Sequence, residues 1–67
     1  MIGRPGVPVL AETLAHPDRQ IRESAAHHLS KLGLLAQAAV PALQEALTDP
    51  DEGVRRAAMS ALRHIEN

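Results

Sequence analysis

The feature that most constrains this chain is an internal duplication without a gap. Residues 7–33 align with residues 40–66 at a constant offset, so that Val7 falls on Val40 and Leu29 falls on Leu62. The ten identical positions of the first copy are Val7, Pro8, Leu10, Glu12, Leu14, Pro17, Asp18, Arg22, Ala25 and Leu29. The matches fall at apolar and turn positions, as expected when one supersecondary unit is used twice.

Each copy carries apolar residues at helical spacing on both sides of a Pro-Asp turn. In the second copy, Val40, Leu43 and Leu47 precede the turn, and Val54, Ala58, Leu62 and Ile65 follow it. This spacing predicts an amphipathic helix on each side of the turn, and no stretch alternates with the period of a strand. We therefore expect an all-α chain with helices over residues 5–15, 19–32, 36–48 and 52–65. They form one domain, 1–67, with repeat 1 at about 5–33 and repeat 2 at about 36–66.

The residues between the predicted helices support this division. A proline excludes the residue before it from the helical region, so Pro17 and Pro50 end the first helix of each repeat. Asp18 and Asp51 then stand at the N-cap positions of the next helices. Asp49 is a rival cap, but its counterpart in repeat 1 is a histidine, so Asp51 is preferred. Gly33 is expected to end the second helix. Pro8 and Pro41 either mark the starts of the first helices or bend them.

The segments Ala39–Leu43, Leu47–Asp51 and Val54–Ala58 with Ala61-Leu62 resemble a HEAT repeat, and most closely the short bacterial phycobilisome-lyase type. Val7–Leu10, Pro17-Asp18, Ile21-Arg22 and Ala25 resemble a second, diverged copy. The resemblance implies an α-solenoid fragment of two HEAT-like hairpins, four helices in all, whose second helices line a concave face. It also implies a scaffold that binds proteins. Structural bonds at the turns are implied as well, carried here by Asp18 with Arg22 and Asp51 with Arg55.

The sequence offers no signature of catalysis. Adjacent residues of a helix point about 100° apart, so His27 and His28 cannot chelate one metal ion. Ser24, Ser30 and Ser60 lie in predicted helices without a glycine-rich elbow. The chain has no cysteine, so it carries no thiol for bilin attachment, for a disulfide or for a cysteine-based metal site. We predict that the chain is not an enzyme and uses no cofactor or metal.

The second helices carry the residues that we expect to bind a partner protein. The predicted protein-binding face is Glu23, His27, Lys31, Arg56, Ser60 and Arg63. Six of the seven basic residues also lie in these helices, Arg19, Arg22, Lys31, Arg55, Arg56 and Arg63, which raises binding to a nucleic-acid backbone as the alternative. A net charge of −1 and the absence of aromatic residues argue against nucleic acid. We expect Arg19–Glu52, Glu23–Arg56 and His16–Asp49 to pair by charge and set the stacking register.

Two repeats share only one junction, whereas three or more are normally needed for a stable array. The last helix is apolar beyond its inner stripe, and leucines lie in the connection between repeats. Leu34, Leu35, Ala57, Met59 and Ala61 are therefore predicted to form a self-association patch, in a homodimer or within a longer array. The apolar runs are far shorter than the roughly 20 residues of a membrane span, so we expect a cytoplasmic chain that does not enter the membrane.

Overall fold

A computed structural model describes residues 6–66, and every regular element among these residues is a helix. They are α1 (Gly6–Thr13), α2 (Arg19–Leu32), a 3₁₀ segment η1 (Gly33–Ala39), α3 (Val40–Ala46) and α4 (Glu52–Glu66). The prediction of an all-α fold built from two helical hairpins is confirmed. Residue 5, where the first helix was predicted to begin, lies outside the described residues.

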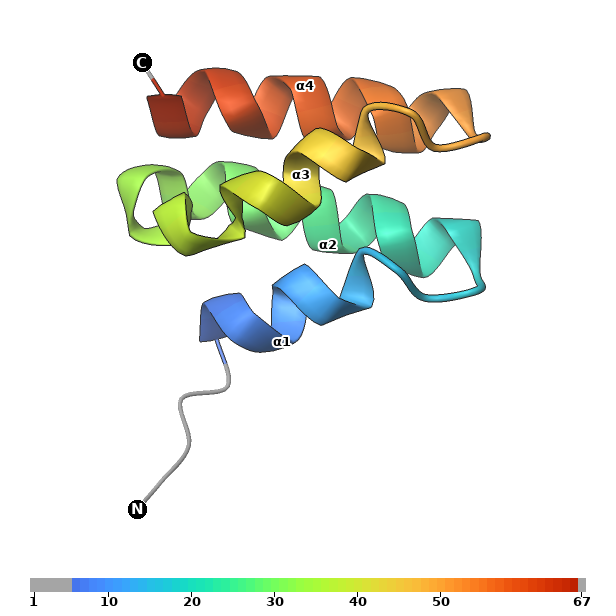
Figure 1. The fold of residues 1–67 in the computed structure, drawn as a ribbon, viewed down its shortest axis with the longest axis horizontal. Helices are drawn as coiled ribbons and strands as arrows, with labels where there is room; N and C mark the ends of the chain where they lie inside the picture. The colour runs from blue at the N-terminus through green and yellow to red at the C-terminus, as the bar shows by residue number, and fades with distance from the viewer. Residues whose placement is uncertain (1–5, 67) are drawn as a thin grey trace.

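The two hairpins are stacked with equivalent helices side by side (Figure 1). In each hairpin the short first helix runs back along the longer second helix, α1 on α2 and α3 on α4. The second helices α2 and α4 lie next to each other and run in the same direction (Figure 1). Translation of one repeat onto the next therefore gives each side chain of α2 an equivalent on α4.

The helix ends are fixed by the residues that the sequence singled out. Asp18 caps α2 by accepting a hydrogen bond from the Gln20 amide at 2.8 Å, and Asp51 caps α4 by accepting one from the Val54 amide at 3.0 Å. Gly33 ends α2 with a positive φ of 56°, a region that L side chains rarely adopt. Pro41 lies in the first turn of α3, where its missing amide hydrogen costs no bond.

The third helix differs from the prediction of one helix over residues 36–48. Its first part is η1, a 3₁₀ segment interrupted at Ala36, where φ is −96° and ψ is 16°. The α-helix begins only at Val40, directly before Pro41, and ends at Ala46. The alanine and leucine content of this segment suits an α-helix, but the chain must first turn from the end of α2 onto the second layer. The tighter 3₁₀ geometry is common in such connectors.

Alanine and six larger aliphatic residues fill the core, Leu14 and Leu62 among them. Leu29, Leu43, Val54 and Ile65 are the largest fully buried side chains. Around them lie the buried alanines Ala25, Ala26, Ala36, Ala39, Ala46, Ala57, Ala58 and Ala61. The small alanine side chains let the helix backbones approach closely. Each fully buried Leu or Ile side chain stabilises the folded chain by about 1.5–3 kcal/mol. The core therefore lies at the α2–α4 junction and beneath α3.

Candidate protein-binding surface

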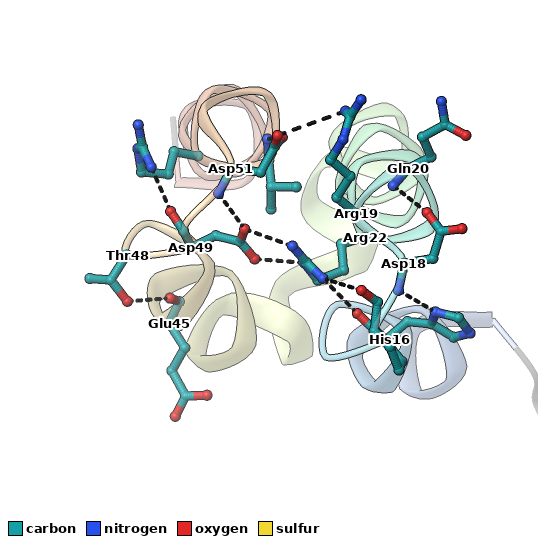
Figure 2. Close-up of polar contacts among 12 residues, drawn as sticks. His16, Asp18, Arg19, Gln20, Arg22, Glu45, Thr48, Asp49 and Asp51 are labelled. Carbon is teal, nitrogen blue, oxygen red and sulfur yellow. Dashed lines mark hydrogen bonds and ion pairs between the residues drawn. The ribbon is translucent and has the colours of Figure 1, made fainter.

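A largely buried ion pair joins the two repeats at their interhelical turns (Figure 2). The Arg22 guanidinium donates Nε–H to Asp49 Oδ2 at 2.7 Å and Nη2–H to Asp49 Oδ1 at 3.0 Å. Its third nitrogen donates to the carbonyl oxygens of His16 and Pro17, both at 2.9 Å. Arg22 therefore closes its own turn with one nitrogen and holds the next repeat with the other two. Such a fork-to-fork pair fixes orientation as well as distance.

Asp49 is held in its ionised form by these contacts. Only 9% of its side chain is exposed, and burial alone would raise the pKa of the carboxyl group. The hydrogen bond from Arg22, the hydrogen bond from the Asp51 amide and the charges of Arg22 and Arg55 outweigh that effect, and the pKa of Asp49 lies below its ordinary value. The junction thus depends on an ionised Asp49.

This pairing corrects the bonds expected at the turns. Arg22 was expected to pair with Asp18 but pairs with Asp49 of the next repeat, since Asp18 is occupied as the cap of α2. Arg55 was expected to pair with Asp51 but donates Nη1–H to the carbonyl oxygen of its own turn, at Asp49. Asp51 instead lies 3.7 Å from the Arg19 guanidinium, across the junction.

The three charge pairs expected to set the register are also replaced by others. Glu52 pairs with Arg56 one turn along α4 at 2.8 Å, so neither meets its expected partner on α2. Glu23 lies 3.6 Å from His27, one turn along α2. His16 offers its carbonyl oxygen to Arg22, and its Nδ1 accepts from the Asp18 amide at 3.0 Å. Charges one helical turn apart meet more readily than charges on neighbouring helices, because their spacing is already fixed.

The predicted protein-binding face lies over the α2–α4 layer. His27, Lys31, Arg56 and Arg63 are exposed, and Glu23 and Ser60 are partly exposed. Within residues 6–66, Arg56 is paired with Glu52, while Lys31 and Arg63 make no ion pair. Arg19 and Arg22 face carboxylates, so the basic residues of these helices do not form one continuous cationic strip.

A hydrogen bond between Ser30 and His64 ties the ends of α2 and α4. Ser30 Oγ lies 2.7 Å from His64 Nδ1. The sequence did not lead us to expect a contact between Ser30 and His64. The signal was available, because Ser30 lies eight residues after Arg22, a spacing that puts both on one side of α2. A hydroxyl and an imidazole alone lack the oriented base and oxyanion donors of a nucleophilic site, so the bond joins the repeats.

The predicted self-association patch is divided by the structure. Ala57 and Ala61 are 3% and 0% exposed because they pack against α2, so their place in an exposed patch was wrong. Leu34 and Leu35 of η1 are 69% and 79% exposed, and Met59 of α4 is 49% exposed. The exposed members of the predicted patch thus fall into two places, η1 and the outer side of α4.

A shallow groove of about 200 Å³ runs between α1 and α3. It is lined by Ala11, Leu14, Ala15, Ala42, Glu45, Ala46 and Asp49. Sites for small ligands usually measure about 300–1,000 Å³ and hold several convergent polar groups. Here one of the two carboxylates is already bound by Arg22. Within residues 6–66, no group of three or more His, Asp or Glu side chains is placed to hold a metal ion.

The described part of the chain contains no helix that is both long enough and apolar enough to cross a membrane. Two stacked helical hairpins, joined turn to turn by a largely buried ion pair, define a helical repeat protein of the solenoid class. The family model described as HEAT repeats matches residues 2–63, and the chain belongs to the HEAT repeat family. No curated protein and no solved structure matches it. HEAT repeats generally act as non-catalytic scaffolds that mediate interactions between proteins.

Proposed function

We propose that this chain is a non-catalytic module that binds another protein through the α2–α4 layer. The observation that carries the proposal is the row of side chains on that layer. His27 and Lys31 of α2 and Arg56 and Arg63 of α4 are exposed on two parallel helices, which pack against α1 and α3 in the other layer. Parallel helices at fixed spacing present such a row as a rigid surface, which lowers the entropic cost of binding. We further propose that the repeats are of the phycobilisome-lyase type and that the chain acts in the cytoplasm.

The test compares a variant of this row with one of the opposite layer. Wild-type chain, Lys31→Glu and Gln44→Glu are used to capture partners from an extract of the source organism, with quantitation by mass spectrometry. Gln44 is exposed on α3, so its variant is a control that adds the same carboxylate to the opposite layer. We expect a defined protein retained by wild type and Gln44→Glu and depleted about tenfold by Lys31→Glu. Equal retention by all three chains would contradict the proposed face.

Self-association is the finer part of the proposal, and η1 is the surface that supports it. Leu34 and Leu35 are neighbours in sequence and are the two most exposed large apolar residues of the described chain. A two-fold contact would bring both leucines of each copy together. Sedimentation velocity at micromolar concentration should give a dimer for wild type and a monomer for Leu34→Ser/Leu35→Ser. A monomeric wild-type chain would contradict self-association through η1 and would not affect the proposal that the chain binds other proteins.

A further inference from the structure

The outer side of α4 repeats the side of α2 that holds repeat 2, and no other segment among residues 6–66 covers it. Several residues of α2 face repeat 2, and four of them mark this side. They are Arg19 opposite Asp51, Arg22 opposite Asp49, the buried Ala26, and Ser30 opposite His64. Their equivalents on α4 are Glu52, Arg55, Met59 and Arg63, a set that we call the C-terminal edge. Figure 1 shows α2 and α4 side by side and parallel. If the α4 side chains are arranged like their equivalents on α2, the C-terminal edge lies on the side of α4 away from repeat 1.

Arg55 on this edge is a half-filled copy of Arg22. Arg22 donates one nitrogen to carbonyl oxygens of its own turn and two nitrogens to Asp49. Arg55 likewise donates Nη1–H to the carbonyl of its own turn, at Asp49. Among residues 6–66, its Nε and Nη2 have no hydrogen-bond partner. Those two nitrogens are the fork that holds a carboxylate in the equivalent site.

Met59 supplies an apolar centre beside this fork. Its equivalent, Ala26, is 0% exposed because repeat 2 covers it, whereas Met59 is 49% exposed. Methionine is a flexible, polarisable side chain that adapts to irregular contacts, and Met59 lies between Arg55 and Arg63 on the same side of α4. We propose that the C-terminal edge binds a helical hairpin of a different protein, whose interhelical turn presents a carboxylate to Arg55.

A second copy of this chain does not supply that chemistry when stacked head to tail. The equivalents of Asp49, Asp51 and His64 in repeat 1 are His16, Asp18 and Lys31. A second copy would therefore set His16 against Arg55, Asp18 against Glu52, and Lys31 against Arg63. The first contact lacks a carboxylate and the other two join like charges, which oppose association.

A two-fold contact through α4 is opposed by charge as well. With Met59 on the axis of two antiparallel copies of α4, residues four positions on either side face each other, as do residues seven positions away. Arg55 would then meet Arg63 of the second copy, and Glu52 would meet Glu66. Neither arrangement of a second copy fits, and a hairpin that fits presents a carboxylate to Arg55, a neutral or basic residue to Glu52 and an acidic one to Arg63.

The chain itself can be converted into a probe with these features. The probe is the full chain carrying His16→Asp, Asp18→Ser, Lys31→Glu and Arg55→Gln, and the receptor is wild type. His16→Asp preserves the turn, because Asp49 Oδ1 accepts from the Asp51 amide as His16 Nδ1 accepts from the Asp18 amide. Serine keeps the cap of α2, and Arg55→Gln prevents the probe from binding itself. The matched control probe retains His16 and carries the other three substitutions.

Isothermal titration calorimetry gives the Kd of each probe for the receptor, after circular dichroism shows that all chains are helical. We expect the probe that carries His16→Asp to bind wild type about tenfold or more tightly than the control probe. The difference should vanish with an Arg55→Gln receptor and shrink with Arg55→Lys, which keeps the charge but lacks the fork. Equal affinities of the two probes, or a difference that persists with Arg55→Gln, would overturn the proposal.

Two further results would overturn the choice of partner. One is wild-type dimerisation lost in Arg55→Gln, which would assign the edge to a second copy. The other is salt-dependent retention on DNA lost in Arg55→Gln, which would assign it to phosphate. The inference rests on the proposed function, since it names the chemistry of a partner. Failure of the proposed function and failure of this inference are distinguishable. The binding row is tested by Lys31→Glu against a natural partner, whereas the C-terminal edge is tested by Arg55 variants against a defined probe.

Discussion

The two repeats place equivalent side chains in different surroundings. Val54 of repeat 2 is 0% exposed, whereas its counterpart Ile21 of repeat 1 is 38% exposed. The same contrast holds for Ala57 against the exposed Ser24 and for Ala61 against the exposed His28. Ser24 and His28 lie on the side of α2 that faces no other helix among residues 6–66, and both are polar, whereas α4 has alanine at the equivalent buried positions. At these two positions the difference between the copies follows burial at the junction.

The core comparison predicts the largest effect. Leu43 is fully buried, and its counterpart Leu10 is only partly buried. We expect Leu43→Ala to cost about 3 kcal/mol of unfolding free energy and Leu10→Ala about 1–2 kcal/mol. Urea denaturation followed by circular dichroism measures both. Leu43→Met, which conserves volume, should cost less than about 1.5 kcal/mol. Equal losses for the two alanine variants would show that the repeats are energetically alike.

The arginine comparison predicts the next effect. Arg22→Met leaves the largely buried carboxylate of Asp49 without its fork, and loss of one partner of such a pair should cost about 2–3 kcal/mol. Arg55→Met removes one hydrogen bond to a carbonyl oxygen and should cost about 1 kcal/mol. The same urea titrations give both values. A larger loss for Arg55 than for Arg22 would contradict the half-filled state of the Arg55 site.

The pH dependence sharpens the same comparison with the smallest effect. Because the pKa of Asp49 is lowered in the folded chain, its contribution to stability is present above the unfolded pKa and is lost as pH falls through the folded value. The free energy of unfolding should therefore decrease as the pH is lowered below about 4, where an unperturbed aspartate becomes protonated. The Asp49→Asn chain should have a lower free energy of unfolding than wild type at pH 7. It should also lose less of that free energy when the solution is acidified. Parallel pH profiles for the two chains would contradict an ionised Asp49 at the junction.

Apolar spacing in the sequence was enough to predict four of the six buried residues of α4, because Val54, Ala58, Leu62 and Ile65 share one face of a regular helix. It missed Ala57 and Ala61, because their burial depends on the neighbouring repeat and not on the helix alone. The caps at Asp18 and Asp51 followed from local turn chemistry in the same way. The Arg22–Asp49 pair did not, because its partners are far apart in sequence and a nearer aspartate stood at helical spacing. The signal available in the sequence was that Asp49 of repeat 2 has a histidine, His16, at the equivalent position of repeat 1. The first repeat has no predecessor among the described residues, so its turn has no arginine to bind.

The parallel course of α2 and α4 has an electrical consequence. Peptide dipoles make the carboxyl end of each helix partly negative, and both second helices end on the same side of the molecule (Figure 1). Equivalent helices stacked in this way would build up a growing negative potential along that side. Each one carries a cation in its last turn, Lys31 in α2 and Arg63 in α4. Every hairpin thereby neutralises its own dipole, and a stack of such hairpins can lengthen without accumulating a field.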